Sequence, residues 1–157
     1  NTLRSLVREN QDKAQDYIQE LSRVLRYTLQ SNESQSVSLR EEMEFASAYI
    51  FLLKMRFENN LQFDIQIAKS FEDYRLPPMA VQVLIENAVK HNEISDRKPL
   101  TIHIVTNDIQ PKRTAASGTG IGLVNLAKRY RLLFKQDIQI TEDKEFSVCI
   151  PLIDEVQ

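Results

Sequence analysis

The first third of the chain has the apolar spacing of amphipathic helices. A short apolar edge ends near Asn10, and a longer stripe then recurs at i, i+3, i+4 and i+7. Asp12 is the predicted N-cap of this second helix, and the polar run 31–36 is the predicted connector after it. The stripe consists of Ala14, Tyr17, Ile18, Leu21, Val24, Leu25 and Thr28.

A third helix is predicted over 39–58, where Ser38 and Glu41 have the spacing of a capping box. Further apolar residues accompany its main stripe, so we expect this helix to be covered on more than one side. The stripe is Leu39, Met43, Ala46, Ile50, Leu53 and Phe57, and the additional residues are Tyr49, Phe51 and Leu52.

The two early helices form a hairpin that is too small to bury both of its faces by itself. Pairing with a second copy in a four-helix bundle would cover the remaining face. Packing of the hairpin on the core of its own chain is the alternative.

Alternating apolar residues predict strands in the second half of the chain. The alternation covers 61–67 and 100–106, and a last hairpin is expected from 137–141 and 146–152. Helices at 39–58, at 77–92 and after Gly122 accompany these strands. Together they predict the α+β class, as a two-layer sandwich with three helices on one face of a mixed sheet.

The helix predicted within 76–92 has one polar side. Four polar residues fall within roughly 140° of arc on a period of 3.6 residues, and they are Glu86, Asn87, Lys90 and His91. Pro77 and Pro78 are compatible with the helix start, because first-turn N–H groups have no helical partner. The polar side suits a phosphate–metal ligand. A solvated face with one Glu86–Lys90 ion pair is the alternative.

All three glycines of the chain lie in one heptapeptide, SGTGIGL, directly before a predicted helix. Gly118, Gly120 and Gly122 would allow the backbone to approach a ligand, and a helix N-terminus offers free N–H groups to phosphate oxygens. The chain has no GxxxxGK[ST] motif and no GxGxxG motif in an early βαβ unit, so it lacks the two commonest nucleotide-binding signatures.

Composition narrows the class of protein only modestly. A net charge of −2 gives no electrostatic reason to expect nucleic acid as a partner. The single cysteine, Cys149, cannot form an internal disulfide, and its place in an alternating run predicts a strand residue rather than a nucleophile. No apolar run approaches the ~20 residues of a membrane span. We interpret the start at Asn1, without methionine, as the start of a fragment.

Two of these motifs resemble those of a known nucleotide-binding fold. IENAVKHN, at 85–92, resembles the N-box and GTGIGL, at 118–123, resembles the G-box of the Bergerat ATP-binding fold. Together with the motifs at 21–30 and 37–57, their order and spacing resemble the LytS-like sensor histidine kinases over nearly the whole chain. The resemblance implies partial dimerisation and phosphotransfer helices over 1–36 and an ATP-binding catalytic domain over 37–157.

The resemblance also implies roles for the N-box and G-box residues. Asn87 would coordinate Mg²⁺, and Lys90 and His91 would lie near the phosphates of ATP. Glu86 and Asn87 would be the catalytic residues, with Glu86 either orienting Lys90 or helping to position the phosphoacceptor. The backbone that approaches the phosphates would be Gly118, Thr119, Gly120, Ile121, Gly122 and Leu123, and the lid would include Lys112 and Arg113.

The adenine-reading motif departs from the family pattern. Asn107 aligns with the usual aspartate, Asp108 is the alternative reader if the register slips by one, and the usual glycine is missing. The chain is also short here, with room for little more than one strand where the family has two. Either it is naturally short or residues are missing from this sequence near Ile104 and Val105. We prefer missing residues, because loss of a central strand would expose a sheet edge.

Two functional classes follow from the resemblance. In the first, the chain is a cytoplasmic kinase fragment that binds Mg·ATP for transfer to a histidine and then to a response regulator. It would dimerise through its N-terminal helices and contact the bacterial inner membrane only through parts outside this sequence. Neither histidine, His91 or His103, lies on a dimerisation helix, so the acceptor would also lie outside it. In the second class, the chain is a degenerate dimeric scaffold that signals by conformation.

A third possibility, an ATPase of the gyrase or chaperone type, is disfavoured by one position. Val83 stands where those enzymes keep a water-activating carboxylate. Its apolar side chain favours phosphoryl transfer, in which positioning and electrostatics provide most of the catalysis.

Overall fold

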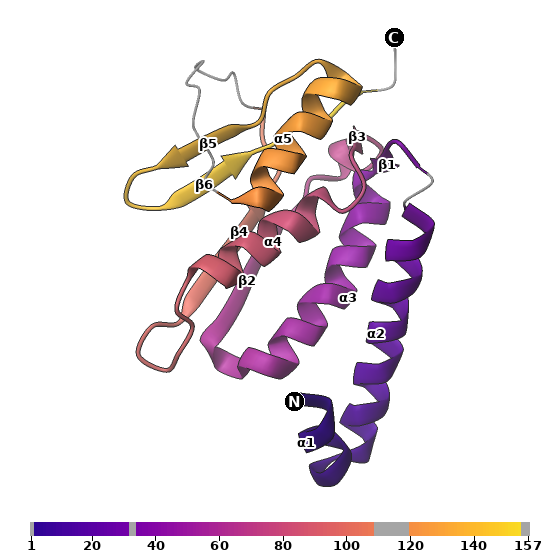
Figure 1. Ribbon diagram of the computed structural model, residues 1–157, viewed down its shortest axis with the longest axis vertical. Coiled ribbons are helices and arrows are strands. Elements are labelled where there is room, and N and C mark those ends of the chain that lie inside the picture. Colours follow the sequence, from indigo (N-terminus) through magenta and orange to yellow (C-terminus); the bar gives the residue numbers. More distant parts are fainter. Residues whose placement is uncertain (1, 32–33, 109–119, 155–157) are drawn as a thin grey trace.

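The computed structural model describes residues 2–31, 34–108 and 120–154 of the 157-residue chain (Figure 1). Its helices are α1 (Thr2–Glu9), α2 (Gln11–Ser31), α3 (Leu39–Phe57), α4 (Ala80–His91) and α5 (Ile121–Phe134). Short 3₁₀ turns occupy Glu58–Asn60 and Lys69–Phe71. The strands are β1 (Val37–Ser38), β2 (Leu61–Gln66), β3 (Arg75–Leu76), β4 (Leu100–Val105), β5 (Gln139–Glu142) and β6 (Phe146–Cys149).

The strands of the described residues pair in three two-stranded sheets. β2 and β4 are parallel, with Leu61 opposite Leu100, whereas the β1–β3 and β5–β6 pairs are antiparallel. The predicted α+β class is confirmed, although the strands do not join in one mixed sheet within the described residues. The hydrophobic core is shared by α3, α4, α5 and the β2–β4 pair, which lies behind α4 in Figure 1.

The third helix is capped as the sequence predicts. The Ser38 side chain accepts a hydrogen bond from the backbone N–H of Glu41, and the Glu41 carboxylate accepts one from the backbone N–H of Ser38 at 2.8 Å. This capping box satisfies two N–H groups that have no partner within the helix. Because both residues lie within one turn, local sequence was sufficient to identify it.

α3 is covered on two sides, which confirms the expectation from its additional apolar residues. Phe45, Ala48 and Leu52 pack with Val24 of α2, whereas the opposite face belongs to the main core. In Figure 1, α2 runs beside α3 on the side away from α4. The central helix therefore connects the N-terminal hairpin with the rest of the molecule.

α2 packs one face on its own chain and leaves a second apolar stripe exposed. Ala14 and Val24 are buried against the neighbouring structure. Ile18, Leu25 and Leu29 are 48%, 56% and 73% exposed. The hairpin therefore packs on the core of its own chain, which was the alternative to pairing with a second copy. This packing covers only part of the apolar surface of α2.

Two helix starts differ from the predicted ones. Asn10, and not Asp12, caps α2, since its side-chain oxygen accepts the N–H of Lys13 at 3.0 Å. Asp12 instead lies in the first turn, where a carboxylate interacts favourably with the helix dipole. α4 begins at Ala80 after Met79, rather than at Pro77, and Met79 has a positive φ of 65°. A residue before proline is disfavoured in helical conformation, so Pro77 cannot begin the helix when Pro78 follows it.

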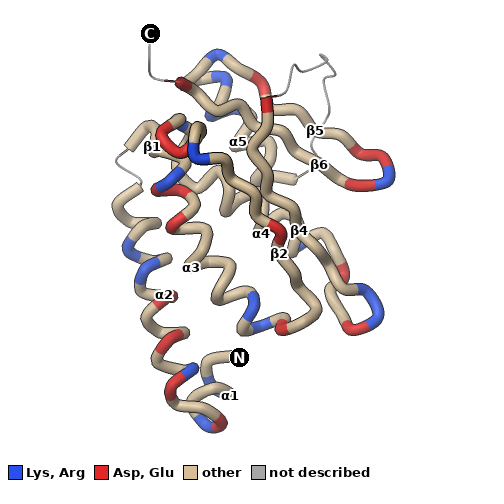
Figure 2. The backbone as a smooth tube through the Cα atoms, turned by 180° about the vertical axis from the view of Figure 1, so that it is seen from behind, with Lys and Arg blue, Asp and Glu red and all other residues tan. Residues whose placement is uncertain are grey.

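Charges of both signs alternate over the surface. Figure 2 shows Lys and Arg interspersed with Asp and Glu along α2 and in the loops before β4 and between β5 and β6. Within the described ranges, none of the helices combines the length and the apolar composition that a membrane span requires.

Candidate nucleotide-binding site

The N-terminal end of α5 lies against the polar side of α4. Gly120 is the N-cap of α5, and a Cβ atom at this position would lie 2.9 Å from Asn87 Oδ1 and 3.5 Å from His91 Nε2. The first of these distances is too short for a real Cβ contact, so any larger residue at this position would displace the Asn87 side chain. The structure therefore brings three of the predicted site residues together, two from the N-box and one from the G-box.

Glycine at this position leaves space for the Asn87 side chain. Gly120 has φ −95° and ψ 142°, a conformation that any residue adopts, and its side of the helix is closed by Asn87. Two residues further on, a Cβ at Gly122 would lie 3.3 Å from Val83 Cγ1. Leu126 of α5 is buried in one cluster with Val81 and Ile85 of α4, so apolar packing holds the two helices together.

The electrostatics of this contact suit an anion. The first turn of α5 contains no acidic residue, and its first intrahelical bond is donated by Val124 to the carbonyl oxygen of Gly120. The N–H groups of Ile121, Gly122 and Leu123 precede that bond and have no partner within the helix. They lie at the positive end of the helix dipole, and the last turn of α4, which contains His91 near Gly120, also contains the exposed basic residue Lys90.

Asn87 offers a single oxygen ligand to a divalent cation. Its side chain is half-buried, and its Oδ1 is oriented toward Gly120. Within residues 2–31, 34–108 and 120–154, no three His, Cys, Asp or Glu side chains come together as a metal site. Mg²⁺ keeps several waters and binds readily through one protein ligand plus phosphate oxygens, so the donor set fits a metal that arrives with a nucleotide.

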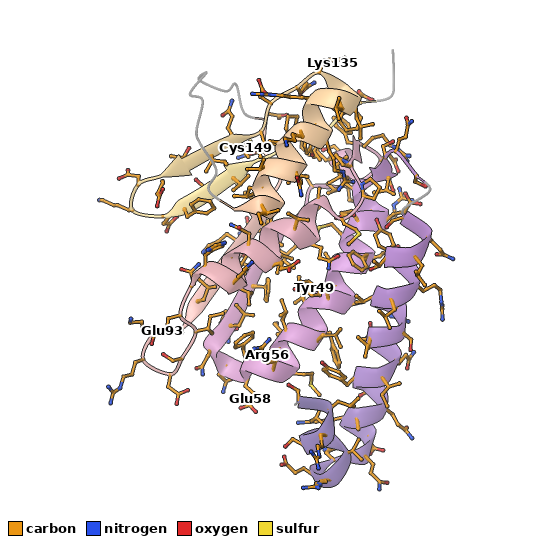
Figure 3. All side chains as sticks on the ribbon, in the orientation of Figure 1. Tyr49, Arg56, Glu58, Glu93, Lys135 and Cys149 are labelled. Atoms are coloured by element: carbon orange, nitrogen blue, oxygen red, sulfur yellow. The ribbon has the colours of Figure 1, made fainter. Side chains whose placement is uncertain are left out.

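Glu86 is exposed on α4, whereas its neighbour Asn87 and His91 lie against Gly120. Burial and then the charge of Glu86 raise the pKa of Tyr49, a half-buried residue of α3 (Figure 3). Among the described residues, Glu86 and Lys90 form no ion pair, so the arrangement gives no support to a role of Glu86 in orienting Lys90. The polar side of α4 is thus divided between α5 and α3.

The candidate adenine readers follow the end of β4. Asn107 and Asp108 are exposed, and no hydrogen bond joins either one to α4 or α5 in the described part of the chain. Thr106 fixes this turn, because its hydroxyl oxygen accepts the N–H of Ala68 at 2.8 Å. β4 is regular through Ile104 and Val105, which pair with β2. The predicted site residues Gly118 and Thr119 lie outside the described residues, as do Lys112 and Arg113 of the predicted lid.

Cys149 behaves as the sequence suggests. It lies half-buried in β6 (Figure 3), and burial raises the pKa of its thiol. A thiol that resists ionisation is a poor nucleophile.

Glu42 is the residue that sequence reasoning missed. It lies in α3, is fully buried, and accepts hydrogen bonds from Tyr27 and from the start of α4. The sequence predicts a role only for its neighbour Glu41, because the capping box joins residues within one helical turn. The available signal was an acidic residue at a position flanked by apolar stripes on both sides, which is unusual for a helix covered on two faces.

Comparisons with known proteins find similarity to sensor histidine kinases. The family model described as Histidine kinase matches residues 1–61. The sensor protein LytS of Streptococcus mutans is 32% identical over 91% of this chain and 29% of its own length. The sensor histidine kinase/phosphatase LytS of Staphylococcus aureus strain Mu50 is 34% identical over 58% of this chain and 16% of its own length. The chain thus spans less than a third of either relative.

The Streptococcus mutans relative is longer within the matched range. The alignment extends over 167 positions, whereas 91% of this 157-residue chain is only about 143 residues. About two dozen positions of the relative therefore have no counterpart here. This difference supports the expectation that the chain is short for its family.

Proposed function

This chain belongs to the LytS-like sensor histidine kinases, and from that premise we propose that it binds Mg·ATP between α4 and the N-terminal end of α5. It would present the γ-phosphoryl group to a histidine outside this sequence, from which the group passes to a response regulator. The proposal assigns residues 37–157 to the catalytic domain and 1–36 to the end of the dimerisation helices.

The observation that carries this proposal is the approach of Gly120 to Asn87 Oδ1 and His91 Nε2. Phosphate oxygens placed there would meet the free N–H groups of α5, with Lys90 and His91 as further donors. Asn87 would hold Mg²⁺, which supplies charge neutralisation across the phosphate oxygens when bound. Of the remaining predicted contacts, Asn107 or Asp108 would accept from adenine, and Gly118 and Thr119 would extend the phosphate loop.

Transfer to a histidine is favoured over hydrolysis by the surroundings of Val83. Its side chain packs toward Gly122, so an apolar group occupies the place from which a carboxylate would activate water. Glu86 instead lies on the α3 side of the same helix, near Tyr49. In that place it would act on an incoming phosphoacceptor rather than on Lys90, which supports the second of its two predicted roles.

The exposed stripe of α2 supports a homodimer. Ile18, Leu25 and Leu29 recur at i, i+7 and i+11, the spacing by which two helices pack in a bundle. A second copy placed on this stripe would cover it and leave the α4–α5 contact accessible. Attachment to a membrane would come through parts of the protein outside this sequence.

Calorimetric titration tests the proposal most simply. The chain would be titrated with a non-hydrolysable ATP analogue, with and without Mg²⁺, and the titration repeated on Asn87→Ala. We expect saturable, Mg²⁺-dependent binding by the wild type. In Asn87→Ala the affinity should fall by about tenfold or more, as it does when residues that support a metal site are replaced. Binding that is unchanged in Asn87→Ala would show that the site lies elsewhere.

A second candidate function is a dimeric scaffold that binds nucleotide poorly. The exposure of Asn107 and Asp108, and the absence of a glycine after them, favour it. The same titration separates the two functions, since a folded protein that binds nothing at millimolar nucleotide would support the scaffold.

A further inference from the structure

The start of α4 is capped by a residue from another helix. Met79, the N-cap position, has no side-chain hydrogen bond to the helix and adopts a left-handed conformation. The backbone N–H of Met79 donates to Glu42 Oε2 at 3.0 Å, and that of Val81 donates to Glu42 Oε1 at 2.9 Å. Glu42 therefore satisfies N–H groups that a helix normally satisfies with its own cap.

The same carboxylate binds the N-terminal hairpin. The hydroxyl of Tyr27, in α2, donates to Glu42 Oε2 at 2.9 Å, so a single oxygen joins α2 to the backbone of Met79. The ring of Tyr27 is stacked on Phe45 with 4.1 Å between centroids, which fixes the direction of the hydroxyl. Glu42 is fully buried, so the carboxylate that accepts these bonds is shielded from bulk water.

α5 is tied to the same point. Arg129 donates to the carbonyl oxygen of Pro78 at 2.7 Å, directly before the left-handed residue. Tyr130 is fully buried, and burial followed by the charge of Glu42 raises the pKa of its hydroxyl. Four helices thus meet at Glu42, and two of them, α4 and α5, form the candidate nucleotide site at their other contact.

We propose that Tyr27 and Glu42 are positioning residues that couple α2 to the nucleotide site, an inference that rests on the proposed function. Neither residue contacts the nucleotide. α4 is a single helix of 12 residues, so a shift of its capped start moves Asn87 and His91 with it relative to Gly120. Coupling between two sites is reciprocal, so a nucleotide bound at α4 and α5 must also restrain α2.

Hydrogen exchange measures that restraint directly. Amide exchange in residues 20–30 of the full chain would be followed with and without saturating Mg²⁺ and a non-hydrolysable ATP analogue. We expect the nucleotide to slow exchange there by about fivefold or more, the lower end of typical coupling between sites. Tyr27→Phe keeps the stacked ring and removes only the hydroxyl, and it should abolish most of the slowing while nucleotide still binds.

Tyr17→Phe is the matched control. Tyr17 lies on the same helix and packs in the same apolar cluster, but its hydroxyl has no hydrogen-bond partner among the described residues. It should keep the full nucleotide effect on α2. Loss of the effect in Tyr17→Phe as well would reduce the role of Tyr27 to general packing and overturn the proposal.

The outcomes separate this inference from the function on which it rests. Nucleotide binding with unchanged exchange in α2, or an effect that persists in Tyr27→Phe, overturns the coupling and leaves the kinase proposal standing. A folded wild-type chain that binds no nucleotide overturns both. Glu42→Gln, which keeps one acceptor oxygen, should show a reduced but measurable effect.

Discussion

The two ends of α4 are built in opposite ways. At its start, Glu42, Tyr27 and Arg129 surround the chain with buried or half-buried hydrogen bonds from three other helices. At its last turn, Lys90 and His91 are exposed, and His91 lies close to Gly120 at the N-terminal end of α5. One end is fixed and the other is free to bind. A helix with this asymmetry is anchored at one end and presents exposed polar side chains at the other.

The largest effect should come from removing the buried cap. Glu42→Ala would leave the N–H groups of Met79 and Val81 and the hydroxyl of Tyr27 buried without acceptors. We expect the free energy of unfolding to fall by about 3 kcal/mol, measured by urea denaturation. Glu41→Ala, at the neighbouring exposed capping box, should cost about 1 kcal/mol or less. Equal effects of the two substitutions would contradict the special role of the start of α4.

A smaller effect is expected from the contact that α5 makes with the same end. Arg129→Met keeps most of the side chain and removes the hydrogen bond to Pro78, which should cost about 1 kcal/mol of unfolding free energy. The control is Arg131→Met on the same helix, where the exposed ion pair with Asp137 should contribute less than about 0.5 kcal/mol. A larger loss at Arg131 than at Arg129 would show that the anchoring contacts have been misidentified.

Adjacent glutamates should give stability profiles of opposite sign. Burial raises the pKa of Glu42, so the folded state binds its proton more tightly, and its contribution to stability is present below the ordinary pKa of 4.5 and lost as the pH rises above it. Hydrogen bonds from Ser38 lower the pKa of Glu41, so its contribution is lost as the pH falls below 4.5. The measurement is the free energy of unfolding of both variants from pH 3 to 7. Glu42→Gln should lose the decrease in stability with rising pH, and Glu41→Gln should lose the decrease with falling pH. Parallel profiles for the two variants would refute the difference in environment.

Local pattern was sufficient for much of the fold. The capping box of Ser38 and Glu41 joins residues one turn apart, and the sequence places it correctly. The start of α4 was predicted too early, because its position depends on Met79 in a left-handed conformation and on a cap from Glu42. Met79 and Glu42 are 37 positions apart in the sequence, and no periodic pattern predicts a contact over that distance.

In the candidate site, too, the sequence predicted the local features and missed those that depend on tertiary packing. Asn87 and His91 are one turn apart on a helix, and the glycine motif precedes another helix, so a resemblance in order and spacing was enough to pair them. Of the two glycines in the described residues, Gly120 approaches both and Gly122 lies near Val83, and this difference depends on the packing of α4 on α5. Glu86 was grouped with Asn87 by arc on the helix, yet the tertiary arrangement turns it toward Tyr49.

The most direct measurement compares two glycine substitutions by titration with Mg²⁺ and a non-hydrolysable ATP analogue. In Gly120→Ala, the new methyl group would displace the Asn87 side chain from a distance of 2.9 Å, whereas in Gly122→Ala it would meet Val83 among the described residues. We predict that Gly120→Ala lowers nucleotide affinity about tenfold or more without loss of stability, and that Gly122→Ala, which keeps its backbone N–H and leaves Asn87 in place, lowers it by a smaller factor. Equal affinities in both variants and the wild type would contradict a nucleotide site at this end of α4.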